Sequence, residues 1–241
     1  MSWNQPSWNQ SSVSAPPVAD VRDERVSAFL GKVYGWMFVG LLITAVVAYG
    51  VALTPGLIET LVLNRLLFWG VLFAQIGLVI YLSARIDKVA PATAAALFAL
   101  YSGLVGVTSS IIFLVYTGAS ITQTFIITAG MFGATAIFGT VTKRSLAGLG
   151  QFLFMGLIGL IIAMVVGFFW QSDMLQFVIS VVGVLIFTGL TAWDAQRLKE
   201  MAVALPDGRV GSYAVVGALS LYLDFINLFF FLLRFTGSRR N

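Results

Sequence analysis

Long apolar segments alternate with short polar breaks along most of the chain. From Lys32 onward the pattern predicts seven helices of about 20 mostly apolar residues, the length that a helix needs to cross a bilayer. The breaks carry turn residues and are short, so consecutive helices should be antiparallel neighbours. The expected helices are 32–53, 66–84, 92–116, 120–141, 147–170, 174–197 and 212–235.

Residues 1–25 do not follow this pattern. They are polar and rich in Pro, Ser, Asn and Gln, with the tetrapeptide SWNQ at Ser2 and again at Ser7. Such a segment buries too little apolar surface to offset its chain entropy. We therefore expect a disordered polar tail over 1–25 and a seven-helix transmembrane domain over 26–237. The tail lacks the charged, apolar and small-residue regions of a signal peptide.

The composition places the chain among membrane proteins. Hydrophobic residues make up 59% of the sequence, charged residues 10%, and the mean hydropathy is +0.95, which excludes the soluble classes. The chain has no cysteine and no histidine, which removes disulfides and the commonest metal ligands and general bases. We expect an all-α integral membrane protein, a seven-helix transmembrane bundle, with no cofactor and no enzymatic activity.

Lysine and arginine predict the orientation. They concentrate before the first expected helix and in the second, fourth and sixth breaks, which the positive-inside rule places in the cytoplasm together with the N-terminus. The chain has no basic run or fold motif for nucleic acid, so we expect no nucleic-acid partner. Seven crossings would put the C-terminus outside, yet it carries Arg234, Arg239 and Arg240. The last segment therefore either spans or re-enters.

The last helix carries a narrow polar stripe. At 100° per residue, five positions fall within a sector of roughly 80°, and they are Tyr213, Gly217, Ser220, Asp224 and Asn227. A charge facing lipid would cost at least about 2.5–3.5 kcal/mol, so the stripe should face protein or water. Asp224 is either a functional group or a structural hydrogen-bond anchor. Ser220, Asn227 and Gly217 are candidates to line a pore.

The sixth helix carries a similar stripe that contains Thr191, a fourth pore-lining candidate, and Asp194. Asp194 is either part of a functional pair with Asp224 or an interfacial residue paired with Arg197 or Gln196. Arg85 closes the second helix at the same expected side of the membrane. It either forms a latch with Asp194 or extends to lipid phosphate.

If the two aspartates meet, they give a pH-sensitive site. Two carboxylates in contact cannot both ionise cheaply in a low-dielectric site, so the pair would share a proton and titrate as a unit. Gain or loss of that proton could make or break an Arg85 bridge and switch one end of the bundle. Asp224 lies roughly 18 Å into its expected helix, so the two meet only if the sixth helix extends past Lys199 or the seventh begins outside the hydrocarbon.

Three segments resemble a known family. ALSLYLDFINLFFFLLRFTG, FTGLTAWDAQRLKE and FGTVTKRSLAGLG are similar to motifs of the Bax-inhibitor family in a bacterial form. The resemblance covers residues 25–237 and implies a bundle with a central C-terminal helix wrapped by two groups of three. It also implies that Asp194 and Asp224 are the family's paired aspartates and that Arg85 is its latch. Members are associated with a pH-sensitive Ca²⁺ leak, and some bacterial members interact with a membrane-bound protease.

Two functions follow as hypotheses. The first is a pH-sensitive leak channel for Ca²⁺ or another cation in the bacterial inner membrane, gated by protonation of the aspartate pair, whose oxygens suit hard cations. The alternative is a non-channel regulator or binding partner of a membrane-bound quality-control protease, in which the aspartates hold helices together. No nucleophile–base set or metal motif supports an enzyme.

Overall fold

The computed structural model describes residues 18–170 and 172–240, and almost all of them are helical. In these ranges there is no β-strand, only one isolated bridge between Tyr116 and Arg239. Seven helical stretches are long and apolar enough to cross a membrane. The expected all-α membrane bundle is confirmed. The helices are α1 (Val18–Ala52), α2 (Pro55–Leu63), α3 (Arg65–Arg85), α4 (Pro91–Ser109), α5 (Ile112–Val115), α6 (Gly118–Val141), α7 (Ala147–Phe169), α8 (Asp173–Ala204) and α9 (Val210–Thr236).

Two expected helix ends were wrong, and one short helix was not expected. Helix α1 begins at Val18, so residues 18–25 are helical, whereas residues 1–17 of the expected tail lie outside the described residues. Helix α8 continues to Ala204 instead of ending near 197, because Ala195, Leu198 and Ala202 turn a buried face toward the bundle. The first break contains a short helix of its own, α2, which begins with Pro55 at a position that favours helix starts.

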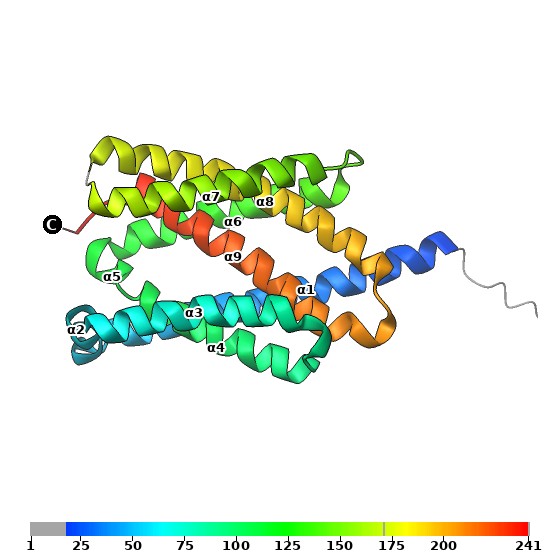
Figure 1. The fold of residues 1–241 in the computed structure, drawn as a ribbon, viewed down its shortest axis with the longest axis horizontal. Coiled ribbons are helices and arrows are strands. Elements are labelled where there is room, and N and C mark those ends of the chain that lie inside the picture. The colour runs from blue at the N-terminus through cyan, green and yellow to red at the C-terminus, as the bar shows by residue number, and fades with distance from the viewer. Residues whose placement is uncertain (1–17, 171, 241) are drawn as a thin grey trace, which may run out of the picture.

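Helix α9 is the centre of the bundle (Figure 1). It runs between one group formed by α1, α3 and α4 and a second group formed by α6, α7 and α8. It packs most extensively against α8 and α1, while α3 and α7 lie outermost. Of the seven candidate spans it is by far the most buried. This is the arrangement that the family resemblance implied.

Small residues allow the helices to approach closely, as expected where lipid supplies no hydrophobic drive between helices. A Cβ added at Gly139 of α6 would lie 2.0 Å from the Ala192 carbonyl oxygen of α8. One added at Gly106 of α4 would lie 2.8 Å from the Thr44 carbonyl oxygen of α1. Backbone therefore packs directly on backbone at these two crossings.

Polar contacts join the connections at the end of the bundle where α1 begins, which we call the N-terminal end. The Arg25 guanidinium donates to the Leu205 carbonyl at 2.9 Å, which ties α1 to the α8–α9 connection. Arg209 pairs with Asp87 at 2.7 Å, and the Tyr213 hydroxyl donates to the same carboxylate at 2.7 Å. The connections α3–α4 and α8–α9 therefore lie together.

The opposite end, which we call the C-terminal end, is fixed by the last residues of the described chain. The Arg240 backbone N–H donates to the Val115 carbonyl at 2.9 Å, and the Thr117 N–H donates to the Ser238 carbonyl at 3.2 Å. Helix α9 is one uninterrupted helix from Val210 to Thr236. It therefore traverses the whole bundle and does not re-enter.

Candidate functional site

The extended α8 brings Asp194 to within about one helical turn of the depth of Asp224. Asp194 lies ten residues before Ala204, and Asp224 lies fourteen residues after Val210. At 1.5 Å per residue these offsets are about 15 Å and about 21 Å from the connection that joins the two antiparallel helices. The ten residues of α8 that follow Asp194 therefore place its carboxyl group deep in the bundle. A helix that ended near 197 would leave it close to the connection.

The two carboxyl groups are buried and interact with each other. Asp194 is 7% exposed and Asp224 is 5% exposed. Each carboxyl group interacts with the other, and Asp194 also interacts with the Ser220 side chain one turn along α9. Oδ2 of Asp224 is buried and has no hydrogen-bond partner among the described residues. The structure thus brings together the two aspartates that were singled out from the sequence, while their role as a pH sensor stays a prediction.

The cation beside the pair is Arg197. Its guanidinium lies 3.9 Å from Oδ1 of Asp194 and 5.6 Å from the ring centroid of Trp193. Arg85 is exposed and forms no ion pair with the described residues, so the expected bridge to Asp194 is absent from this conformation. The reason is local, because Arg197 follows Asp194 by three residues on the same face of α8. Gln196 binds Leu146 and Arg144 instead.

Two cavities meet at the aspartates. The first, which we call the end cavity, has a volume of about 230 Å³ and reaches Asp194 from the N-terminal end between Ser83 of α3 and Tyr213 of α9. The second, which we call the lateral cleft, has a volume of about 680 Å³ and is lined by α3, α7, α8 and α9. Asp194, Arg197 and Ser220 line both cavities, and Asp224 lines the lateral cleft. The pair is therefore reached from two directions.

The predicted pore-lining residues divide between these spaces. Gly217 and Ser220 line the end cavity, and Ser220 and Asn227 line the lateral cleft. Thr191 lies in neither cavity, because it is fully buried in the helix packing and its hydroxyl donates to the Phe187 carbonyl at 2.7 Å. It serves helix packing in this conformation, and its place along a pore stays a prediction.

Beyond Asp224, the buried face of α9 is apolar up to the C-terminal end. The side chains of Leu228, Phe231 and Leu232 are each 6% exposed or less. Phe231 stacks on Phe187 of α8 with ring centroids 5.8 Å apart. We call Leu228, Phe231 and Leu232 the apolar plug. It lies along α9 between Asp224 and the C-terminal end of the bundle.

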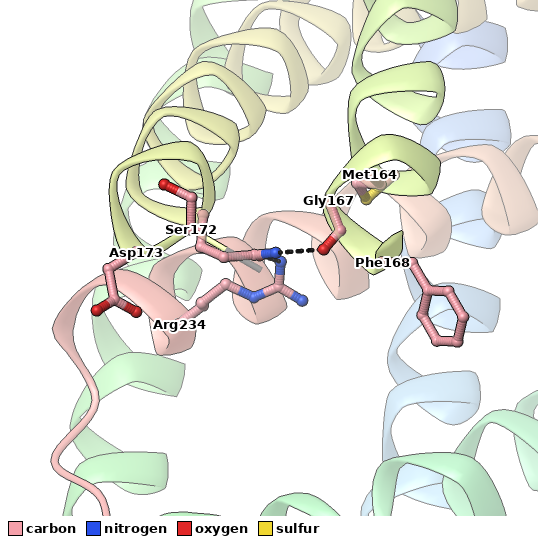
Figure 2. Close-up of a pocket in the computed structure, with 7 residues that line it drawn as sticks. Met164, Gly167, Phe168, Ser172, Asp173 and Arg234 are labelled. Atoms are coloured by element: carbon pink, nitrogen blue, oxygen red, sulfur yellow. Dashed lines mark hydrogen bonds between the residues drawn. The ribbon is translucent and has the colours of Figure 1, made fainter. Parts of the chain in front are cut away.

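A separate pocket of about 560 Å³ lies at the C-terminal end between α7, α8 and α9 (Figure 2). Arg234 donates to the Gln176 side-chain oxygen at 3.1 Å, and the Gln176 amide donates to the Gly167 carbonyl at 3.4 Å. Asp173 also lines the pocket, but its carboxylate turns away from the Arg234 guanidinium (Figure 2). This pocket is on the far side of the apolar plug from the aspartate pair.

The acidic residues do not form a chelating cluster. Within the described ranges, no three acidic side chains gather in a way that could hold a metal ion. Ca²⁺ takes six to eight oxygen ligands in a stable site.

Some residues at the site were not anticipated from the sequence. Gln75, Tyr101 and Trp193 line the lateral cleft, and the Gln75 amide donates to the Leu104 carbonyl at 2.9 Å. Asp87 and Arg209 were not anticipated either, and Asp87 joins Arg209 to Tyr213 of the predicted stripe beside the end cavity. Arg85 had marked the end of α3 from the sequence, and the polar Gln75 inside this apolar helix is the signal that could have marked its middle as part of the site.

Comparison with known proteins identifies a family and relatives that match most of the chain. The family model described as "Inhibitor of apoptosis-promoting Bax1" matches residues 26–241. The inner membrane protein YbhL of Escherichia coli is 48% identical over 218 residues, which cover 89% of this chain and 93% of that protein. An uncharacterised protein of Borreliella burgdorferi is 47% identical over 88% of this chain and 93% of its own length. A third relative, from Rickettsia prowazekii, is 40% identical over 91% and 93%.

Proposed function

Because the chain belongs to the Bax inhibitor family, as a multi-pass protein related to a bacterial inner membrane protein, we propose that it is a pH-sensitive cation leak gated by its aspartate pair. The permeant ion is Ca²⁺ or another cation that moves down its gradient. The observation that carries the proposal is the contact between the buried carboxyl groups of Asp194 and Asp224 at the meeting point of two cavities.

The gate works through a shared proton. Two ionised carboxylates in a buried, low-dielectric contact repel each other, so the pair is stable when one proton bridges it. Loss of that proton adds a charge that the single Arg197 beside Asp194 cannot neutralise alone. The repulsion then favours separation of α8 and α9 at this level, and these helices carry the apolar plug between them.

The cation's route begins at the N-terminal end. The end cavity gives access to Asp194, and the carboxylate, hydroxyl and amide oxygens of Asp194, Ser220, Asp224 and Asn227 follow along α9. Such weak, successive oxygen sites favour passage over retention. The apolar plug is the remaining barrier, and its displacement opens the path. We place the N-terminus in the cytoplasm on the basis of the lysine and arginine distribution.

Ion flux into liposomes tests this function. Purified protein should pass Ca²⁺ at a rate that changes about tenfold as the pair titrates, which corresponds to about 1.4 kcal/mol in the gating equilibrium. Asparagine resembles the protonated aspartate in shape and charge. Asp224→Asn should therefore hold the flux, at every pH, near the value that the unmodified protein shows at its acid limit. Asp194→Asn should act in the same direction.

Glu59→Gln is the matched control, because Glu59 is an exposed carboxylate on α2, far along the chain from the pair. It should keep the full pH dependence. Flux equal to that of protein-free liposomes at every pH would eliminate the leak. In that case the alternative remains, a non-channel partner of a membrane-bound protease in which the aspartates are structural.

A further inference from the structure

The lateral cleft has features that cation passage does not require. It opens on the side of the bundle, where α3 packs against α4 and makes no substantial contact with α7. Phe73, Ile76 and Ile80 of α3 line it and are 65%, 55% and 61% exposed. Because these side chains face the lipid, the cleft opens toward the hydrocarbon core of the membrane and not toward water.

The walls of the cleft are apolar and aromatic. Helix α3 contributes Trp69, helix α7 contributes Phe154 and Leu157, and helix α8 contributes Phe187 and Trp193. Its volume of about 680 Å³ lies in the range of small-molecule sites, which combine apolar walls with a few convergent polar groups. An alkyl chain entering from the bilayer would exchange lipid contacts for these side chains at little cost.

At the bottom of the cleft, one buried hydrogen-bond acceptor has no partner among the described residues. Asp224 is 5% exposed and lines the cleft, and its Oδ2 has no hydrogen-bond partner among the described residues. Arg197 is already engaged with Asp194 at 3.9 Å and with the Trp193 ring. A buried acceptor without a partner costs free energy, and a ligand that brings a donor to it would recover that cost.

We infer that the lateral cleft binds a lipophilic primary amine, with its ammonium group on Asp224 and its alkyl chain along α3 and α7. An ammonium group has three donors, which can reach Oδ2 of Asp224 and the side-chain oxygen of Ser220 or of Asn227, which lie about one turn to either side of Asp224 along α9. It also carries the single positive charge that complements the second negative charge of the pair once the shared proton is lost, because Arg197 offsets only the first. A neutral alcohol lacks this charge, and an alkyl carboxylate is repelled.

Tryptophan quenching by brominated alkyl probes tests the inference without measuring flux, so it can fail or succeed independently of the leak. The full-length protein in nanodiscs of neutral lipid would be titrated with an ω-bromoalkylamine and with the bromoalkyl alcohol of the same length. The amine should give saturable quenching with an apparent affinity at least tenfold tighter than that of the alcohol. Trp69→Phe, which removes a fluorophore that lines the cleft, should reduce the saturable component.

Three variants decide the result. Asp224→Asn should abolish the preference for the amine over the alcohol. Should that variant fail to fold, Val79→Phe fills the cleft from α3 and leaves the aspartates in place, while Val46→Phe adds the same bulk at a lipid-exposed position outside the cleft. Val79→Phe should lose the saturable quenching and Val46→Phe should keep it. Equal affinity for amine and alcohol, or saturable quenching that survives Val79→Phe, would overturn the inference.

Discussion

At the scale of single residues, the protein tolerates charge inside a membrane segment by surrounding it with other polar groups. Asp224 sits in a helix that is otherwise apolar, yet it contacts Asp194 of α8 and faces the polar side chains of its own helical stripe. This position could be predicted, because 100° periodicity places the stripe on one side of α9. The ion-pair partner of Asp194 was left open in the sequence, since both Arg85 and Arg197 were within reach of the pattern.

At this scale, shortening a side chain of the apolar plug should change the basal Ca²⁺ flux. Leu228→Ala removes a fully buried side chain from the path beyond Asp224, so it should raise basal Ca²⁺ flux severalfold at every pH. The substitution also creates a cavity that costs about 2–5 kcal/mol of stability. Leu219→Ala, at a position 1% exposed in the same helix on the other side of Asp224, costs a similar amount and should leave the flux unchanged. Equal leaks through both variants would mean that the effect comes from lost stability and not from the plug.

At the scale of helices, the number and order of the spans could be predicted from the sequence, whereas several helix ends could not. Seven spans and their order follow from hydropathy, whereas α8 beyond Arg197 enters the polar run QRLKE. The sequence nevertheless indicates that the helix continues, because Ala195, Leu198 and Ala202 recur at helical spacing. All three are buried in the structure. The start of α1 was missed for the same reason: polar composition outweighed the periodicity of Val26, Phe29 and Val33, of which Phe29 and Val33 are buried.

The α6–α8 crossing gives a prediction about packing. Gly139→Ala would place a Cβ 2.0 Å from the Ala192 carbonyl oxygen, so the helices must separate and the protein should lose stability. Gly130→Ala, in the same helix with nothing within 4 Å, should gain up to about 1 kcal/mol from helix propensity. Thermal unfolding in detergent measures both variants. A Gly139→Ala protein as stable as the Gly130→Ala protein would contradict the close crossing.

At the scale of the whole molecule, the two ends of the bundle differ in their connections. The α1 start, the α3–α4 connection and the α8–α9 connection lie together, whereas the C-terminal residues pack against the α5–α6 connection at the opposite end. Figure 1 shows α9 running diagonally from one end to the other. The terminal arginines therefore sit at the end opposite to the other basic connections, which charge counting alone could not resolve.

This topology can be tested by labelling, because the chain contains no cysteine. Ser238→Cys and Ser145→Cys place single thiols at exposed positions of the C-terminal and N-terminal ends. With the N-terminus in the cytoplasm, a membrane-impermeant maleimide should label Ser238→Cys in intact spheroplasts and Ser145→Cys only after permeabilisation. The reverse pattern would show that the whole bundle is inverted, and labelling of both from one side would contradict the spanning α9.

The proposed gate depends most directly on the shared proton, and infrared spectroscopy of the reconstituted protein measures that proton. At neutral pH the unmodified protein should show the carbonyl stretch of a protonated, buried carboxylic acid, and the band should disappear as the pH is raised. The same band should be missing or displaced in both Asp194→Asn and Asp224→Asn, since the proton belongs to the pair, and unchanged in Glu59→Gln. A spectrum with only carboxylate bands at neutral pH, or a protonated band that persists unaltered in both asparagine variants, would contradict the account.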